Sequence, residues 1–182
     1  MLRENVAGRL LTTSEAALTL TEILVAIAVI GILASLLIPT LTAAKRKANS
    51  VRCISNLRQL GIAVRLYADD NDGRLPRARG FAQSETNEAG GLPVIQQVLA
   101  PQLRGVRAVF KCPGDKGGVF EREGSSYEWN TSLNGGILHR IGQDRPEGNV
   151  TKTFLLRDRE GWHSRGRRNA VFADGHVGPD GL

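Results

Sequence analysis

Two carboxylates and two imidazoles near the C-terminus are the side chains best suited to bind a divalent metal: Asp158, His163, Asp174 and His176. Such oxygen and nitrogen ligands suit zinc or another divalent ion, and they could converge if the last two strands of the chain pair. Asp174-Gly175 between apolar residues is, however, also a hairpin signal. The sequence leaves two interpretations open: a metal site built on all four residues, and a turn in which Asp174 and Gly175 have no ligand role.

A second group of oxygen ligands, the run Asp69-Asp70-Asn71-Asp72, is compatible with calcium. The alternating acids and the distant bidentate glutamate of an EF-hand are absent. Because Asp and Asn side chains also make local hydrogen bonds in turns, we interpret this run as the end of a helix. We therefore expect no resident cofactor, with a divalent ion, calcium or zinc, as the alternative.

The two cysteines, Cys53 and Cys112, are too few for a four-cysteine zinc site or a disulfide-dense mini-protein. In an exported domain they are compatible with one disulfide, which would close a loop of about 60 residues and stabilise the fold by about 4 kcal/mol. The alternative is two unrelated buried thiols. No serine or cysteine stands in a nucleophile motif, so we expect no enzymatic activity; a metal-dependent enzyme built on the four C-terminal ligands is the rival.

These side chains must be positioned by a chain whose densest apolar segment lies near its N-terminus. Residues 18–41 contain a single charge, Glu22, and as an α-helix would extend about 36 Å, enough to cross a hydrocarbon core of about 30 Å. A core helix of that length would have a polar face. A removable secretory signal does not fit either, because residues 1–17, which are mixed polar with a weak apolar patch, precede the segment and no small-residue cleavage site follows it. The segment is predicted to span a membrane.

Glu22 is the unusual residue of this segment, since an acidic side chain at the centre of a membrane helix costs about 3 kcal/mol. It lies four residues after Leu18. If the chain were cut before Leu18, the new α-ammonium would lie within one helical turn of the carboxylate. It could then pair with Glu22 of the same subunit or of a neighbour, and the helix dipole would also favour an anion there. The pattern indicates assembly rather than catalysis.

The remaining chain is predicted to form a small α+β domain. Apolar residues recur at intervals of three and four from Ile54 to Ala68, which indicates an amphipathic helix that ends near Gly73 and Pro76. A short helix is expected within residues 92–103, and residues 80–91 and 134–149 are interpreted as loops. Short apolar runs bounded by turn residues predict an antiparallel sheet, with strands at residues 108–111, 125–129, 153–156 and 170–173.

The 182-residue chain has a formal charge of +6 and a pI of about 9.9. Its basic residues form two short groups, Lys45 to Lys47 and Arg165 to Arg168, and no nucleic-acid-binding module accompanies them. We expect a solvated basic surface with no nucleic-acid partner, and contact of Lys45 to Lys47 with anionic lipid headgroups as the alternative.

A nine-residue segment resembles the type IV prepilin cleavage and methylation motif, usually Gly-Phe-Thr-Leu-Ile-Glu-Leu-Leu-Val: Ala17-Leu18-Thr19-Leu20-Thr21-Glu22-Ile23-Leu24-Val25. The resemblance implies cleavage after Ala17, methylation of Leu18, and Glu22 as the residue that directs each subunit onto the previous one. Ala17 replaces the usual glycine and Leu18 the usual phenylalanine. Pro39 matches the family's proline, which softens or kinks the helix because it lacks an N–H group.

The soluble part is similar to a large group of bacterial prepilin-like proteins from planctomycete and verrucomicrobial genomes, usually described as type II secretion or processing-associated proteins. The similarity rests on five segments: residues 52–61, 67–73, 111–115, 126–130 and 171–177. The group's C-terminal hallmark is a histidine followed, after nine residues, by Asp-Gly. Here ten residues separate His163 from Asp174.

The resemblance implies a pilin-like fold and four segments: a leader (1–17), a membrane and assembly helix (18–41), an amphipathic stalk helix (42–73) and a small periplasmic α+β domain (74–182). It implies a structural subunit of a type II secretion pseudopilus or a pilus-like fibre. The implied partners are a prepilin peptidase/N-methyltransferase, other pilin-like subunits, an inner-membrane assembly platform and membrane lipid. A membrane-tethered surface module that binds polysaccharide or nucleic acid is the rival function.

The positive-inside rule and the prepilin resemblance predict opposite orientations of the chain in the membrane. Lys45, Arg46 and Lys47 follow the apolar segment, so the positive-inside rule would place the C-terminal part in the cytoplasm. The resemblance places the leader in the cytoplasm and the C-terminal domain in the periplasm, because cleavage before Leu18 requires a cytoplasmic leader. We expect a single-pass inner-membrane protein with that second orientation, which enters a periplasmic or surface fibre after assembly.

Overall fold

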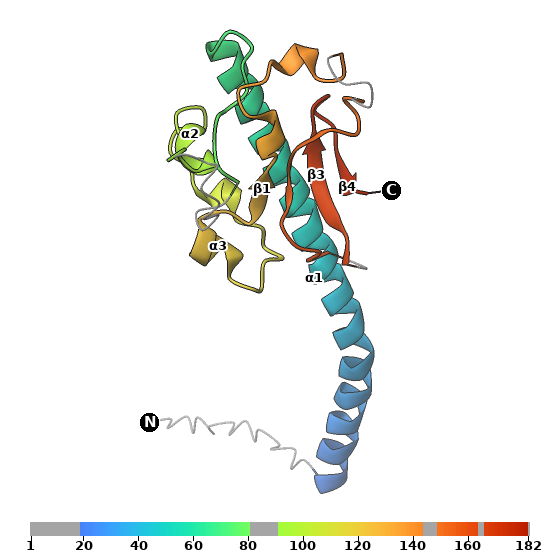
Figure 1. Cartoon of the computed structure of the whole chain (residues 1–182). Coiled ribbons are helices and arrows are strands. Elements are labelled where there is room, and N and C mark those ends of the chain that lie inside the picture. Colours follow the sequence, from blue (N-terminus) through green and yellow to red (C-terminus); the bar gives the residue numbers. More distant parts are fainter. Residues whose placement is uncertain (1–18, 81–90, 144–148, 164–165, 182) are drawn as a thin grey trace, which may run out of the picture. The chain divides into compact units, whose positions relative to one another are not determined.

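The computed structural model describes residues 19–80, 91–143, 149–163 and 166–181. A long helix, α1, precedes a small domain of short helices and a four-stranded antiparallel sheet (Figure 1). The chain divides into two compact units, residues 1–41 and 42–182. The helices are α1 (Leu20–Asp70), α2 (Ile95–Val98), α3 (Val119–Glu123) and the 3₁₀ helices η2 (Ala108–Phe110), η3 (Thr131–Leu133) and η4 (Leu138–Arg140). The strands are β1 (Tyr127–Trp129), β2 (Phe154–Asp158), β3 (Arg168–Phe172) and β4 (Val177–Asp180).

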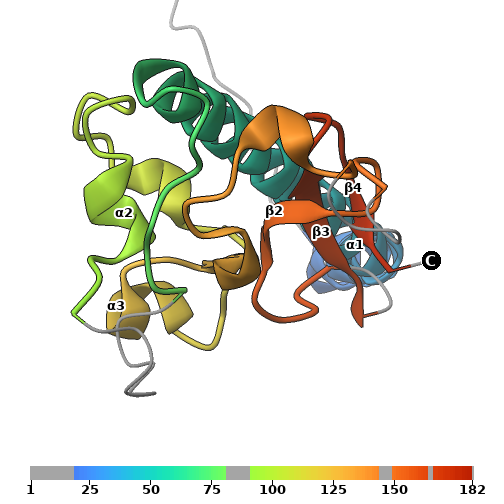
Figure 2. The same cartoon turned by 45° about the horizontal axis from the view of Figure 1, so that its top comes forward.

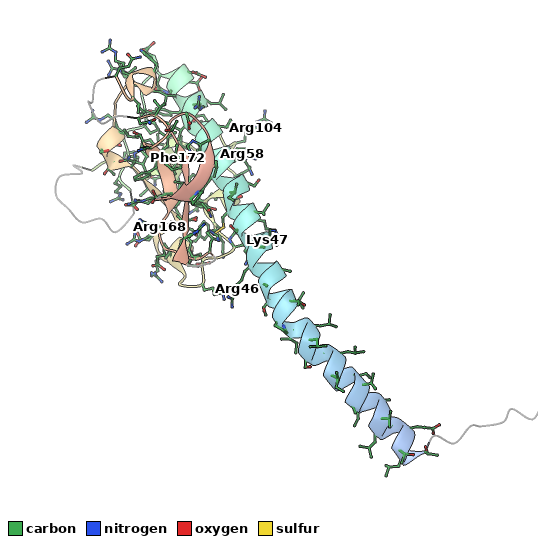
Figure 3. The ribbon with its side chains drawn as sticks, turned by 90° about the vertical axis from the view of Figure 1, so that its right-hand side faces the viewer. Arg46, Lys47, Arg58, Arg104, Arg168 and Phe172 are labelled. Atoms are coloured by element: carbon green, nitrogen blue, oxygen red, sulfur yellow. A yellow bond between two sulfur atoms is a disulfide. The ribbon has the colours of Figure 1, made fainter. Side chains whose placement is uncertain are left out.

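The first part of α1 is apolar on all sides and has its large side chains exposed, from Leu20 to Leu41. Among the described residues, α1 is the helix long and apolar enough to cross a membrane. The two hydroxyls in its interior, Ser35 and Thr40, donate to carbonyls three residues earlier in the same helix. Pro39 lies within the helix. Figure 3 shows Arg46 and Lys47 on α1 beyond this apolar segment.

The second part of α1 is amphipathic, as the sequence predicted. Its buried residues follow the intervals of three and four that a helix needs to bury one face, and they are Cys53, Leu57, Leu60, Gly61, Ala63, Val64 and Ala68. The helix ends at Asp70, within the acidic run. The Asn71 side chain donates to the Tyr67 carbonyl (2.7 Å) and the Gly73 N–H donates to the Ala68 carbonyl (2.8 Å). Gly73 has φ 76°, a left-handed conformation that glycine adopts without strain.

The sheet has the order β1-β2-β3-β4, with every neighbouring pair antiparallel. Three of the four expected strands are present. The prediction of a strand at residues 108–111 is wrong, because Ala108–Phe110 is the 3₁₀ helix η2. Sequence reasoning also missed β4, whose Gly178-Pro179 pair argues against a strand. Pro179 is tolerated because β4 is an edge strand that pairs with β3 alone. The two loops expected at residues 80–91 and 134–149 are described only in part, because residues 81–90 and 144–148 lie outside the described residues. The 3₁₀ helix η4 forms within the second of these segments.

The stalk part of α1 runs along one face of the sheet (Figure 2). Gly61 is buried on this face, and a Cβ atom added to it would lie 2.6 Å from Cγ2 of Val171 on β3. Four residues further along the helix, the Arg65 guanidinium donates to the Ala173 carbonyl (2.9 Å). Leu57, Leu60 and Val64 join Leu155 and Leu156 of β2 in one buried cluster. The absence of a side chain at residue 61 therefore lets the helix approach β3 closely.

We predict that Gly61→Ala destabilises the domain. In an uncrowded helix this change stabilises by about 1 kcal/mol, but here the new methyl group meets a stiff, buried valine, and overpacking typically costs about 1–3 kcal/mol. The free energy of unfolding should fall by about 1 kcal/mol when urea unfolding of the full chain in detergent is followed by tryptophan fluorescence.

The matched control is Gly61→Ala in the Val171→Ala background, where the methyl group has space. There the same change should stabilise the domain. A stabilising effect of Gly61→Ala in the unchanged chain would contradict the close packing of α1 on β3.

Candidate functional site

Glu22 lies in the first turn of α1 and is held by Thr19, the residue before the helix. Its carboxylate oxygen Oε2 accepts hydrogen bonds from the Thr19 backbone N–H (2.8 Å) and hydroxyl (2.6 Å). In return, the Glu22 N–H donates to the Thr19 hydroxyl oxygen (3.3 Å). This reciprocal arrangement is a capping box. It places an acidic side chain at the positive end of the helix dipole, where an anion is favoured.

Ala17 and Leu18, the predicted cleavage and methylation residues, lie outside the described residues. The pairing of Glu22 with an α-ammonium group therefore remains a prediction, as does a kink at Pro39. In the uncut chain the capping box already supplies two donors to the carboxylate. A cut before Leu18 would add a cation within one turn of an acid whose position Thr19 fixes.

The two cysteines form a disulfide that joins α1 to the segment after η2. Cys53 and Cys112 are both fully buried, their Cα atoms are 5.1 Å apart, and 59 positions separate them in the sequence. Nearby, the Asn56 side chain donates to the Lys111 carbonyl (2.9 Å), so a polar contact holds the same two segments. By the loop-entropy argument a loop of this length contributes about 4 kcal/mol to stability.

Asp158 and His163 lie together beside this disulfide. The His163 Nε2 atom is 3.0 Å from Oδ2 of Asp158 and 3.7 Å from the Cys112 sulfur. The side chain of His163 is 5% exposed and that of Asp158 is 0% exposed. The backbone and side-chain N–H groups of Asn169 also donate to Oδ2 of Asp158, at 2.7 and 3.1 Å.

Asp174 and His176 form a separate pair in the turn between β3 and β4. Oδ1 of Asp174 accepts from the His176 backbone N–H (3.0 Å) and lies 2.6 Å from its ring Nδ1. The imidazole stacks on Phe172, with ring centroids 4.3 Å apart. Desolvation raises the pKa of Asp174, but the hydrogen bonds from His176 outweigh it and leave that pKa below its usual value. Gly175 has φ 92°, as the hairpin interpretation requires.

The structure thus separates the four expected metal ligands into two pairs. Asp158 is bound by Asn169 near the start of β3, whereas Asp174 follows the end of that strand. The extended chain from Asn169 to Phe172 alone spans about 10 Å, so one ion cannot bind both carboxylates. Within the described part of the chain, the acidic, histidine and cysteine side chains that gather in one place are Cys53, Cys112, Asp158 and His163, whose ligand atoms all lie within 4.8 Å of one another.

Asp115 fixes the loop that carries Cys112. Its carboxylate accepts from the backbone N–H groups of Val119 (3.1 Å) and Phe120 (2.8 Å) at the start of α3. It also accepts from the Ser126 hydroxyl (2.8 Å), whose oxygen in turn accepts from the Cys112 N–H (3.1 Å). Desolvation raises the pKa of Asp115, but these hydrogen bonds outweigh it and lower that pKa overall.

A comparison with known proteins finds similarity over one third of the chain. Sixty residues are 40% identical to the type II secretion system core protein G of Escherichia coli (strain K12). The aligned segment covers 33% of this chain and 41% of that protein. The chain therefore matches about two fifths of the length of this relative. No family model and no solved structure matches the chain. The fold, a long N-terminal helix packed on a small antiparallel sheet, is a pilin-like arrangement.

We predict that Asp115→Asn weakens the domain at neutral pH by about 1 kcal/mol, the usual cost of a lost helix cap. A carboxylate with a lowered pKa in the folded state contributes stability above its unfolded pKa, and that contribution is lost as the pH falls through the folded pKa. The difference between the two proteins should therefore be largest near pH 7 and should shrink below about pH 4.

Melting temperatures measured from pH 7 to pH 3 test this expectation. Asp69→Asn, a change of an exposed carboxylate, is the control and should shift stability by less than about 0.5 kcal/mol. A constant difference between Asp115→Asn and the unchanged chain across this pH range would contradict the role given to Asp115.

Proposed function

We propose that this protein is a pseudopilin-like structural subunit that assembles with other pilin-like subunits in a type II secretion pseudopilus or a related fibre. The observation that carries the proposal is the 40% identity over 60 residues to a type II secretion system core protein G. The pilin-like arrangement of α1 and the sheet supports it. So does the position of one acidic residue, Glu22, in the first turn of an otherwise apolar segment.

In this proposal a prepilin peptidase/N-methyltransferase cuts the chain after Ala17 and methylates the new N-terminus at Leu18. Cleavage replaces a peptide bond with an α-ammonium group at the start of the membrane helix. In a medium of low dielectric an unpaired charge is strongly unfavourable. The ammonium of one subunit and Glu22 of its neighbour would therefore stabilise each other, which gives each added subunit a defined axial position.

The apolar part of α1 supports two successive roles. Its large apolar side chains stand exposed along the helix. In the bilayer, lipid would cover them, and the helix would store the subunit before assembly. In a fibre, the same side chains would pack against the helices of neighbouring subunits, while residues 42–182 would form the fibre surface.

A periplasmic location of the domain agrees with its disulfide. Bonds such as Cys53–Cys112 persist in oxidising compartments and are rare in the cytoplasm. This argues against the topology that the charges at Lys45 to Lys47 alone would favour. In the proposed orientation these residues emerge on the periplasmic side of the inner membrane, and the assembly platform would extract the subunit from there.

We predict that Glu22→Ala abolishes assembly and leaves membrane insertion intact. Breaking a buried ion pair costs about 3–5 kcal/mol, so the fraction of the protein in sheared fibres should fall by at least about 100-fold in cells that contain the assembly machinery. The measurement is the ratio of fibre-bound to membrane-bound protein by quantitative immunoblotting.

Ser35→Ala is the matched control because it removes another polar side chain from the same apolar segment, one whose hydroxyl donates to the Ile32 carbonyl of its own helix. It should assemble as the unchanged chain does. Normal incorporation of the Glu22→Ala protein, at an equal membrane level, would refute the assembly role of Glu22.

A further inference from the structure

The buried cluster around the disulfide has the composition of a metal site. Two sulfur atoms, one imidazole nitrogen and one carboxylate come together from α1, the segment after η2, the end of β2 and the segment after it. Cys53, Cys112 and Asp158 are fully buried, and the His163 side chain is 5% exposed. Thiolate, imidazole and carboxylate are all zinc ligands, and four of them make a closed, tetrahedral site of the structural type.

Two distances within the cluster are close to those of a tetrahedral site, one inside the expected range and one about 0.3 Å below it. Zinc bonds of about 2.3 Å to sulfur and about 2.0–2.2 Å to nitrogen or oxygen place neighbouring ligand atoms about 3.3–3.8 Å apart. The His163 Nε2 atom is 3.7 Å from the Cys112 sulfur and 3.0 Å from Oδ2 of Asp158. The two sulfurs alone are much closer, because they are bonded to each other. Breaking that bond is therefore a change that a metal ion would need.

An independent observation points to a ligand at this position. The second carboxylate oxygen of Asp158, Oδ1, is buried and has no hydrogen-bond partner, whereas Oδ2 accepts from Asn169 and faces His163. A buried oxygen without a partner costs about 1–3 kcal/mol, more for a charged group. Such atoms are uncommon in folded proteins and require an explanation. A cation held between the carboxylate and the sulfurs would provide one.

The surroundings of the cluster already hold two of its ligand groups in place. Asn169 orients Asp158 through two hydrogen bonds. The Gly114 N–H group donates a hydrogen bond to the Cys112 sulfur, with a nitrogen–sulfur distance of 3.4 Å. Hydrogen bonds of this kind fix the orientation of metal ligands, and their loss commonly weakens binding. The histidine's Nε2 faces inward, toward both the sulfur and the carboxylate, as a ligand atom must.

We propose that, when its cysteines are reduced, this cluster binds a zinc ion through the sulfurs of Cys53 and Cys112, Nε2 of His163 and the carboxylate of Asp158. Disulfide and metal are then alternative states of one site. A dithiol reductant gives two electrons and two protons, the S–S bond breaks, and the reductant itself becomes a disulfide. Each thiol then releases its proton to solvent as its sulfur bonds to Zn²⁺.

Both states tie the same elements together. The disulfide fixes Cys53 of α1 to Cys112, and the zinc ion would fix the same two residues and add His163 and Asp158. A domain that is still reduced could therefore hold α1 against the sheet before oxidation. Metal binding and folding are coupled when the ligands come from distant parts of a chain, and these four come from three separate regions of this one.

The test uses the full chain in detergent, reduced with a phosphine and titrated with Co²⁺ under anaerobic conditions. Cobalt substitutes for zinc and reports a tetrahedral thiolate site through its d–d and charge-transfer absorption bands. We expect these bands to saturate at one Co²⁺ per chain and to disappear on addition of one equivalent of Zn²⁺. The oxidised chain should show none of them.

His163→Ala and His163→Gln remove one ligand, and His176→Ala is the matched control, since it removes a histidine of the other pair. The loss of an outer-shell partner commonly weakens metal binding by about 10- to 100-fold, so either His163 variant should bind at least about ten-fold more weakly, and His176→Ala should bind unchanged. A cooperative melt of each oxidised variant establishes that it is folded. Absence of the cobalt bands in the reduced chain, equal binding by the oxidised chain, or undiminished binding by both folded His163 variants would overturn the proposal.

Discussion

The contact between Gly61 of α1 and Val171 of β3 determines how closely the long helix approaches the sheet, and the rest of the domain depends on that approach. At this distance the Arg65 guanidinium reaches the Ala173 carbonyl on one side of the contact. On the other side Cys53 reaches Cys112. A larger side chain at residue 61 would move the helix away from both. The helix is therefore fixed by close packing at its centre and by covalent and polar contacts on either side.

The same helix must satisfy two environments. Its first part is apolar on all sides, as lipid or neighbouring helices require, and its second part presents one apolar face to the sheet. The one charged side chain among residues 20–41 is Glu22, which lies in the first turn and is held by Thr19. The proposed assembly through Glu22 and the close packing at Gly61 thus involve separate parts of one helix.

Much of the fold could be predicted because its signals are local. The three- and four-residue spacing of Leu57, Gly61 and Val64 indicated the buried face of the stalk, and Asp174-Gly175 indicated the last turn. Residues 108–111 failed as a strand because a short apolar run does not distinguish a strand from a 3₁₀ turn. β4 was missed because proline is tolerated only in an edge strand. Whether a segment forms an edge strand depends on the strand order of the whole sheet, which the local sequence around Pro179 does not reveal.

The candidate site was only partly predictable for a related reason. Asp158 and His163 were predicted as candidate metal ligands from their types, but the sequence offered Asp174 and His176 as their neighbours. The actual neighbours, Cys53 and Cys112, precede them by many residues and reach them only because α1 crosses the sheet. The antiparallel register places Asp158 beside Asn169, near the start of β3, and no local pattern gives that register. The Cys53–Cys112 bond itself was compatible with the sequence but not required by it.

The central claim, that a processed N-terminus and Glu22 together direct assembly, is tested most directly by the intact mass and N-terminal sequence of the protein from its native membrane fraction. The account predicts a chain that begins at Leu18 and is heavier by one methyl group. That result would establish the cut, the cytoplasmic leader and the amine that Glu22 requires. A chain that begins at Met1 would contradict the account. Glu22 would then lack its partner, and a membrane-tethered binding protein would become the better description.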